Sequence, residues 1–270
     1  MRRIFSDEEL EYIKSNYSYK TYKQITEEIN AFNAIKKSEK QVRTKAATMG
    51  LSKTVHKYDR HYFKNIDTRE KAYWLGFIYA DGYIMRSEKP DGRSSSELGI
   101  EVNSIDKEHL YSFEKCIGGS NNITTRISKD RYIEGKLVKG GVEMSLIRLF
   151  SADMVCDLIA HNIVPNKTYK PEFPKIDEKY FYDFLRGYFD GDGCVYYSHN
   201  KLGLNLTCSN VNFLQYLANE LEKDDVETSI HKEKDYKYRL NFKGDKYKVL
   251  SMLYNNSNLY LKRKYDIAYG

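Results

Sequence analysis

Two acidic residues stand at matching positions of a repeated segment, and together they could hold a divalent cation. Residues 74–82 read WLGFIYADG, and residues 185–193 read LRGYFDGDG. Both segments carry glycine at the third position and close on Asp-Gly, which places the acids at Asp81 and Asp192. Mg²⁺ prefers oxygen ligands, and two carboxylates can bind such an ion beside a phosphate group. The repeat therefore predicts a metal site built from two carboxylates.

Apolar and aromatic residues dominate both segments, which predicts that each forms the last turns of a buried helix. Glycine inside a helix costs about 1 kcal/mol relative to alanine, so Gly76 and Gly187 need a packing reason. Close approach of a second backbone is such a reason, because glycine has no side chain to prevent it. We expect the two helices to pack side by side, which would bring Asp81 and Asp192 together at the helix ends.

The glycines that follow the acids, Gly82 and Gly193, are predicted to take the left-handed conformation that ends many helices. A carboxylate at a helix C-terminus faces the negative end of the helix dipole, so both acids are disfavoured there unless a cation offsets them. The alternative is that two unrelated apolar helices each end in Asp-Gly by chance, since this dipeptide is common in turns.

The composition of the 270 residues is that of a folded protein with a basic N-terminus. Hydrophobic residues make up 41% and aromatic residues 14%, which is enough for a core, and no apolar run reaches the length of a membrane span. Residues 1–57 contain twelve Lys/Arg and seven Asp/Glu, so most of the net charge of +6 lies there and indicates a polyanionic partner. The cysteines have no paired spacing and predict buried free thiols in a reducing, cytoplasmic compartment; they are Cys116, Cys156, Cys194 and Cys208.

Three short helices are predicted within residues 1–51, each opening with a capping box in which Ser or Thr precedes Glu or Gln by three places. The boxes are Ser6 with Glu9, Thr21 with Gln24, and Ser38 with Gln41. The third helix is basic and carries Lys40, Arg43 and Lys45. A three-helix unit with a basic third helix is typical of a helix-turn-helix DNA-binding domain, and this one resembles the Myb-like units. The alternative is a helical module that binds protein, or no partner at all.

The remainder of the chain repeats one order of elements. Residues 52–66 are polar, basic and aromatic without periodicity, and we interpret them as a linker or as an arm that follows phosphates. The patterns then predict helix, strand, strand, helix, strand, strand and helix over residues 67–170, and the same order over residues 171–270. The predicted class is α+β, with two αββαββα units related by a pseudo-twofold axis and preceded by a small three-helix domain.

The paired segments resemble the motif of the LAGLIDADG homing endonuclease family in its single-chain form with two motif copies. The resemblance covers about residues 67–267 of this sequence. It implies that the two motif helices pack at the centre of a pseudo-dimer, and that two four-stranded sheets form a saddle over the DNA major groove. It also implies that Asp81 and Asp192 bind the catalytic divalent ions, taken as Mg²⁺. The preceding residues, Ala80 and Gly191, would belong to the same site as motif neighbours or through their backbone carbonyls.

Further site residues follow from the same resemblance. Units of this family often close with an apolar residue and then a lysine, which is similar to Ile-Val-Pro-Asn-Lys ending at Lys167 and to Leu-Lys-Arg-Lys ending at Lys264. These lysines would organise water or stabilise charge at the edge of the active site, with Lys262 as the alternative in a shifted register. A structural or solvated role is the alternative for each. Asp190 stands at the sixth motif place, where the first copy has Tyr79, and is a weaker candidate as a metal ligand.

Basic residues near the strand ends suit, as a set, a surface that faces DNA. The candidates include Arg86, Arg126, Lys129, Arg131, Lys201 and Lys232. Each of them taken alone has the alternative of being a solvated charge.

The resemblance implies a site-specific endonuclease that cuts both strands of DNA. It would act as a monomer on a long, asymmetric double-stranded target and be encoded by a phage or a mobile intron. The alternative is a non-catalytic nucleic-acid binder on the same scaffold, either an intron RNA maturase or a transcription regulator. An intein is disfavoured, because the sequence runs from Met1 to Gly270 without splicing residues at its ends.

Overall fold

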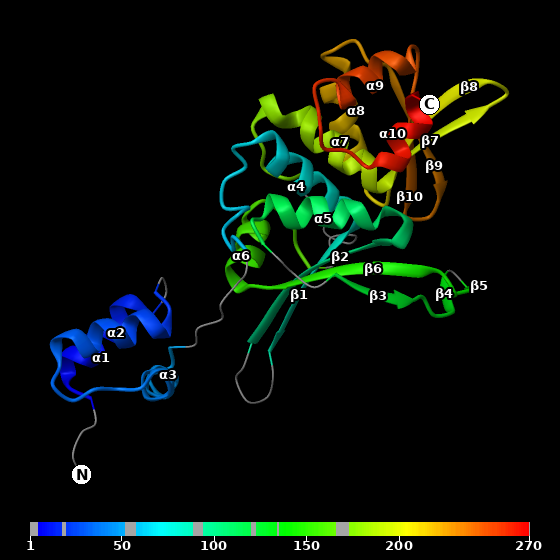
Figure 1. Ribbon diagram of the computed structural model, residues 1–270. Coiled ribbons are helices and arrows are strands. Elements are labelled where there is room, and N and C mark those ends of the chain that lie inside the picture. Colours follow the sequence, from blue (N-terminus) through cyan, green and yellow to red (C-terminus); the bar gives the residue numbers. More distant parts are fainter. Residues whose placement is uncertain are drawn as a thin grey trace. The chain divides into compact units, whose positions relative to one another are not determined.

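The structure is a computed structural model that describes residues 5–17, 20–51, 58–88, 94–119, 123–133, 135–165 and 173–269. The chain folds into two compact units, Met1–Val55 and His56–Gly270 (Figure 1). Among the described residues, no helix combines the length and the hydropathy needed to span a bilayer.

The first unit consists of three helices, α1 (Asp7–Asn16), α2 (Tyr22–Phe32) and α3 (Glu39–Thr48). All three predicted capping boxes are formed; in the first, the Ser6 hydroxyl accepts from the Glu9 N–H at 3.2 Å, and the Glu9 carboxylate accepts from the Ser6 N–H at 2.7 Å. Side chains from all three helices form its core, including Ile13, Ile25 and Val42.

The second unit contains the repeated order of elements that the sequence predicts. Its first half comprises α4 (Arg69–Asp81), β1 (Gly82–Glu88), β2 (Ser94–Asn103), the 3₁₀ turn η1 (Ser104–Asp106), α5 (Lys107–Cys116), β3 (Thr124–Ile127), β4 (Arg131–Ile133), β5 (Lys136–Val138), β6 (Glu143–Phe150) and α6 (Ala152–Ala160). Its second half comprises η3 (Glu178–Tyr180), α7 (Phe181–Asp192), β7 (Gly193–Ser198), β8 (Lys201–Cys208), α8 (Val211–Glu222), β9 (Thr228–Lys234), β10 (Lys237–Phe242), α9 (Lys246–Tyr254) and α10 (Lys262–Tyr269). The α+β class is confirmed, and the short β4–β5 sheet and α10 are additions to the predicted pattern.

Each half builds one antiparallel four-stranded sheet, in the order β1-β2-β6-β3 in the first half and β7-β8-β10-β9 in the second. Helices cover one face of each sheet, and α4 and α7 lie side by side between the two halves (Figure 1). The buried side chains of both halves form one continuous core. The two halves therefore fold as a single body around α4 and α7.

Part of the predicted linker belongs to this core. Residues 52–57 lie outside the described residues, but Tyr62, Phe63 and Ile66 are buried in the second unit. The backbone N–H of Asp59 also donates to the carbonyl oxygen of Ile117 at 2.8 Å. The prediction that the whole of 52–66 is a linker was wrong, because apolar residues spaced without helical or strand periodicity can still pack as a turn.

The cysteines are free, as predicted, but the prediction that they are buried was wrong. Cys156 and Cys194 are exposed, and Cys116 and Cys208 are half-buried. Their wide spacing excluded short disulfide or metal motifs, and it carried no information on which face of a helix or strand each would occupy.

Candidate active site

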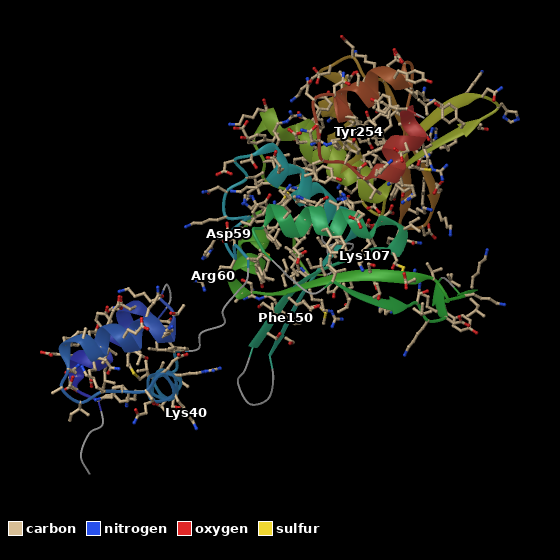
Figure 2. The ribbon with its side chains drawn as sticks, in the orientation of Figure 1. Lys40, Asp59, Arg60, Lys107, Phe150 and Tyr254 are labelled. Carbon is tan, nitrogen blue, oxygen red and sulfur yellow. The ribbon has the colours of Figure 1, made fainter. Side chains whose placement is uncertain are left out.

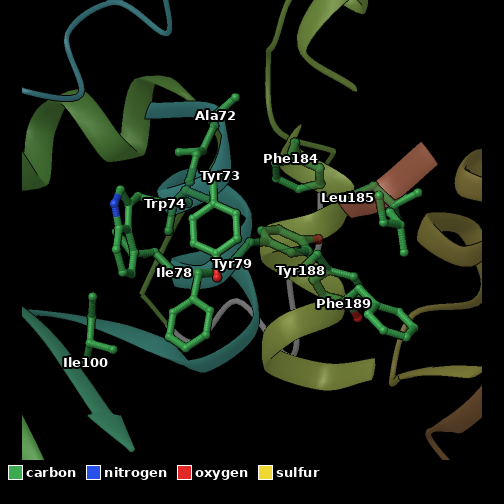
Figure 3. Close-up of a cluster of buried hydrophobic side chains, with 14 of the residues drawn as sticks. Ala72, Tyr73, Trp74, Ile78, Tyr79, Ile100, Phe184, Leu185, Tyr188 and Phe189 are labelled. Atoms are coloured by element: carbon green, nitrogen blue, oxygen red, sulfur yellow. The ribbon is translucent and has the colours of Figure 1, made fainter. Parts of the chain in front are cut away.

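The helices α4 and α7 cross with their backbones in contact, and the two motif glycines lie at the crossing. A Cβ placed on Gly187 would lie 1.9 Å from the carbonyl oxygen of Tyr73, and a Cβ on Gly76 would lie 2.0 Å from that of Phe184. Figure 3 shows Tyr73 of α4 and Phe184 of α7 in the core around this crossing. Only glycine permits such an approach, so the predicted packing reason is confirmed.

The glycines that follow the acids differ from the prediction. Gly82 and Gly193 are extended, with φ of −76° and −80°, so the left-handed assignment was wrong. A Cβ on Gly82 would lie 2.8 Å from the carbonyl oxygen of Ile78, and a Cβ on Gly193 would lie 2.4 Å from that of Phe189. Glycine is therefore needed for space, because the chain turns from each helix directly into the first strand of a sheet.

Asp81 and Asp192 are the last residues of α4 and α7, and both side chains are exposed. The two helix ends touch through small residues. A Cβ placed on Gly191 would lie 2.3 Å from the Cβ of Ala80 and 3.4 Å from a carboxylate oxygen of Asp81. Because Gly191 directly precedes Asp192 in the chain, the structure brings the two predicted acids to the same place.

Lys264, the predicted basic residue of the second half, is buried at the C-terminus of α7. Its ammonium group donates to the carbonyl oxygens of Phe189, Gly191 and Gly193 at 2.8, 3.0 and 2.5 Å. The last carbonyls of a helix lack partners within the helix, and a cation there complements the helix dipole. Lys264 thus fixes the end of the helix that carries Asp192.

The electrostatic setting of Lys264 links it to both acids. Burial lowers the pKa of the Lys264 ammonium, and the negative charges of Asp190, Asp81 and Asp192 oppose that shift. Lys262 is not part of this arrangement, because it is exposed and paired with Asp266 at 2.5 Å. Lys167 lies outside the described residues.

We expect Lys264→Met to lower the free energy of unfolding by about 3 kcal/mol, because it leaves three carbonyls without a donor where a charged group satisfied them. Urea denaturation measures the loss. The matched control is Lys262→Met, which removes an exposed ion pair and should cost less than about 1 kcal/mol. Equal losses in the two variants would show that Lys264 does not hold the end of α7.

Asp190 is buried in the core and is not available to a surface ion. Its carboxylate accepts hydrogen bonds from the hydroxyls of Tyr73 and Tyr254, each at 2.7 Å, and from the backbone N–H of Leu261 at 2.8 Å. Burial raises the pKa of Asp190, and these hydrogen bonds oppose that shift. The prediction of Asp190 as a weaker metal ligand was wrong, since its donors and burial give it a structural role.

The buried hydrogen bonds around Asp190 join the two halves. The Tyr73 hydroxyl gives its proton to Asp190, so it accepts from Nε2 of His109, which is 2.9 Å away. His109 belongs to the first half, and Tyr254 lies among the helices of the second half (Figure 2). Burial lowers the pKa of His109 to about 3, so its imidazole is neutral in the folded protein.

His109 is expected to make the protein less stable in acid. Its pKa is about 3 when folded, against about 6.5 in an unfolded chain. Between these values only the unfolded chain binds the proton, so stability present above pH 6.5 is lost progressively as the pH falls towards 3. Urea titrations between about pH 7 and about pH 4 measure how the free energy of unfolding declines. His109→Gln should make this decline less steep, by up to the slope that corresponds to about one bound proton. A variant with an unchanged pH dependence would contradict a neutral, buried His109.

Each sheet leaves one face open, opposite its helices, and strand register identifies the residues on it. Buried residues such as Ile84, Leu98 and Leu149 lie on the helix side, and the alternate rows lie on the open face. On the first sheet these rows include Tyr83, Met85, Glu97, Gly99, Glu101, Arg126, Arg148 and Phe150. On the second sheet they include Tyr196, Ser198, Lys201, Gly203, Asn205, Thr207, Ser229, His231, Arg239 and Asn241.

Arginines on the open faces are held by carboxylates of the same face. Arg126 donates to Glu101 through two bonds of 2.6 and 2.9 Å. The Nε of Arg148 lies 3.2 Å from a carboxylate oxygen of Glu97. In the second sheet Arg239 pairs with Glu233. The open faces are thus polar, and their guanidinium groups are oriented in advance.

The predicted DNA-facing residues divide between the two sides of the sheets. The structure brings Arg126 and Lys201 to the open faces. It does not bring Arg86 or Lys232 there. Arg86 lies in the same row as Ile84, Lys232 lies in the same row as Ile230, and both rows face the helices. Lys232 is paired with Asp235 at 2.7 Å. In the first unit, Lys40 extends from α3 (Figure 2), Arg43 is also exposed, and Lys45 is half-buried.

Sequence analysis missed Arg148 and Arg239, which lie inside strands and not near strand ends. A signal was present for both, because Arg239 also stands between an aromatic residue, Tyr238, and an apolar one, Leu240. Arg148 stands between Ile147 and Leu149, and an apolar-polar-apolar triplet in a strand places its middle residue on the face away from the core.

Comparisons with known proteins point to one fold. Residues 182–259 match a family model described as a LAGLIDADG-like domain. No curated protein matches the chain. Among solved structures, I-DmoI in complex with DNA and Ca is 17% identical, with a TM-score of 0.51, over 78% of this chain and all of that chain. The LAGLIDADG meganuclease I-AabMI bound to uncleaved DNA is 15% identical, with a TM-score of 0.46, over 73% of this chain and 87% of that chain.

The identity to I-DmoI is low, so this similarity concerns the fold. It agrees with the two antiparallel sheets, the central helix pair and the duplicated order of elements described above. Residues 182–259 therefore match a LAGLIDADG-like domain, and the second unit of this chain has the LAGLIDADG homing endonuclease fold.

Proposed function

We propose that this protein is a site-specific endonuclease that cuts both strands of a DNA duplex with divalent metal ions held by Asp81 and Asp192. One observation carries the proposal: the two acids stand together at exposed helix ends, and each directly precedes the first strand of a sheet with an open polar face. DNA lying along both open faces would pass the two carboxylates.

The residues of this site fit a hard divalent cation such as Mg²⁺. Their donors are oxygens, namely the carboxylates of Asp81 and Asp192 and the backbone carbonyls of Ala80 and Gly191. The Gly191 carbonyl accepts from Lys264, which leaves it one further lone pair. Within the described ranges, no three His, Cys, Asp or Glu side chains gather to enclose a metal, so water and phosphate would complete the coordination. A bound cation would activate water and stabilise charge on the phosphate.

The protein's own groups position this chemistry. The close crossing at Gly76 and Gly187 fixes the separation of the two helix ends, and Lys264 holds the end of α7. We propose that Lys167 serves the first half in a corresponding way. Because Asp190 is buried in a closed hydrogen-bond network, the charges that face the substrate are those of Asp81 and Asp192.

The open faces are proposed to bind the duplex on either side of the acids. Glu97 orients Arg148, and Glu101 orients Arg126. Each carboxylate offsets the charge of its arginine and so lowers non-specific attraction to phosphates, while the free edge of the guanidinium group can contact bases. Lys201 would contribute from the second sheet. Arg86 and Lys232, near strand ends on the helix side, are proposed to reach only the DNA backbone.

The first unit is proposed to be a helix-turn-helix domain of the Myb-like type, spanning residues 1–51. Lys40, Arg43, Thr44 and Ala47 of α3 are exposed at helical spacing and form one face. A helix with such a face suits the major groove, and Lys45 would lie at its edge. Residues 67–170 and 171–270 are proposed as the two catalytic units of a monomer that recognises a long, asymmetric target.

Selection from a randomised DNA pool tests the proposal. The protein is incubated with the pool and Mg²⁺, and cleaved ends are sequenced. We expect cuts in both strands at one recurring sequence, and no cutting with EDTA present. Specific binding without cleavage would instead favour the non-catalytic alternative, an RNA maturase or a transcription regulator on the same scaffold.

A further inference from the structure

A short two-stranded ribbon extends from the connection between β3 and β6 of the first sheet. Among the described residues, its strands β4 and β5 pair only with each other, and they lie where β3 ends and β6 begins (Figure 1). We call residues 128–142 the basic hairpin. The corresponding connection of the second half, between β9 and β10, consists of Asp235 and Tyr236 alone. The two halves therefore differ most clearly at this point.

The base of the basic hairpin is fixed by hydrogen bonds and close packing. The backbone N–H of Ser128 donates to the carbonyl oxygen of Val142 at 2.8 Å, and the N–H of Gly141 donates to that of Ser128 at 2.9 Å. The Asp130 carboxylate accepts from the N–H of Gly140 at 2.7 Å. A Cβ on Gly140 would lie 2.2 Å from the Ser128 carbonyl oxygen. The ribbon thus leaves the sheet in a defined direction.

The ribbon has two different faces. Tyr132 pairs with Leu137 on one face, and Arg131 pairs with Val138 on the other, which also carries Lys136. All five side chains are exposed, and Tyr132 is 75% accessible. Such an isolated two-stranded ribbon has no core of its own, which indicates that it packs against a partner when it acts.

The charge of the basic hairpin identifies that partner. Four of its cations are exposed: Lys129, Arg131, Lys136 and Lys139. None of the four lies within ion-pair distance of a carboxylate in the described part of the chain, in contrast to Arg126 and Arg148 on the open face. Unpaired cations on a projecting ribbon suit a polyanion, and the major groove of B-DNA admits a two-stranded ribbon.

We infer that the basic hairpin contacts duplex DNA beyond the part that the first sheet covers, with Arg131 and Lys136 at phosphates. The inference rests on the proposed function, in which DNA lies along the open faces. β3, the strand that leads into the hairpin, carries Arg126 on that face, so the hairpin begins two residues after a side chain of the proposed DNA-binding surface. The second half has only a two-residue turn at the corresponding place, between β9 and β10. The contact made by the basic hairpin therefore lengthens the DNA target on the side of the first half alone.

The double variant Arg131→Ala/Lys136→Ala tests this inference on the full chain. The probe is a duplex carrying the site that the wild-type protein selects from a randomised pool. We expect the footprint boundary to retreat on one side only. The slope of log Kd against log salt should fall by about 2, because about 0.9 is lost for each phosphate contact. The matched control is Lys115→Ala/Lys175→Ala, which removes two exposed cations that belong to no strand of either sheet.

The outcomes separate the inference from the proposed function. A wild-type chain that protects no duplex overturns both. A wild-type footprint that the hairpin variant reproduces on both sides, with the same salt slope, overturns the inference alone. So does a hairpin variant whose slope changes no more than that of the control. One-sided retreat with unchanged cleavage at saturating protein supports the inference.

Discussion

Asp81→Asn and Asp192→Asn are each expected to reduce double-strand cleavage at least about 100-fold, which corresponds to about 3 kcal/mol of activation free energy. Asparagine keeps the size of the side chain but removes the negative charge that would hold a divalent cation. DNA binding should change little, because the open faces and the basic hairpin are untouched. Cleavage of a supercoiled plasmid with Mg²⁺, alongside a gel-shift Kd, separates the two quantities.

Asp225→Asn is the matched control for these variants. Asp225 is an exposed acid after α8, and asparagine tolerates its positive φ of 56°. Its cleavage rate should equal that of the wild type. If both motif variants still cut the plasmid at the control's rate, the two aspartates do not hold the catalytic ions.

Gly187→Ala is expected to lower the free energy of unfolding by about 3 kcal/mol, at the upper end of the cost of overpacking a core. The new Cβ would lie 1.9 Å from the Tyr73 carbonyl oxygen, and that atom belongs to a helix backbone that cannot rotate away. Separating α4 from α7 would also move Asp81 relative to Asp192. We therefore expect a lower Tm in calorimetry and, at temperatures where the variant is folded, slower cleavage.

The control for this variant is Gly118→Ala. An added Cβ at Gly118 meets nothing within 4 Å, and only its left-handed φ of 68° is unfavourable, at about 1 kcal/mol. A loss at Gly187 no larger than that at Gly118 would mean that the helices can separate freely, and the close crossing would not be needed for stability.

The fold was largely predictable because it depends on local patterns that occur twice. The alternation of the strands and two interior glycines each act within a few residues, and duplication made them visible. The capping boxes of the first unit are equally local, and they marked the starts of its three helices. Gly76 and Gly187 are the clearest case: an unfavourable residue in a helix implied a neighbour close enough to require it, and that neighbour is present.

What could not be predicted depends on register and on contacts between distant residues. A shift of one residue moves a strand side chain to the other face, so Arg86 and Arg126 looked alike in the sequence. The partners of Asp190 come from three separate segments of the chain, so the donors that satisfy this carboxylate inside an apolar helix could not be identified from the sequence. Tyr62 and Phe63 pack into the core from a stretch with no periodicity.

The bonds from Lys264 to the end of α7 have a consequence for biosynthesis. The helix that carries Asp192 leaves the ribosome more than seventy residues before the lysine that holds its last carbonyls. We therefore expect the last turn of α7, and with it Asp192, to reach its final position only after residue 264 has left the ribosome.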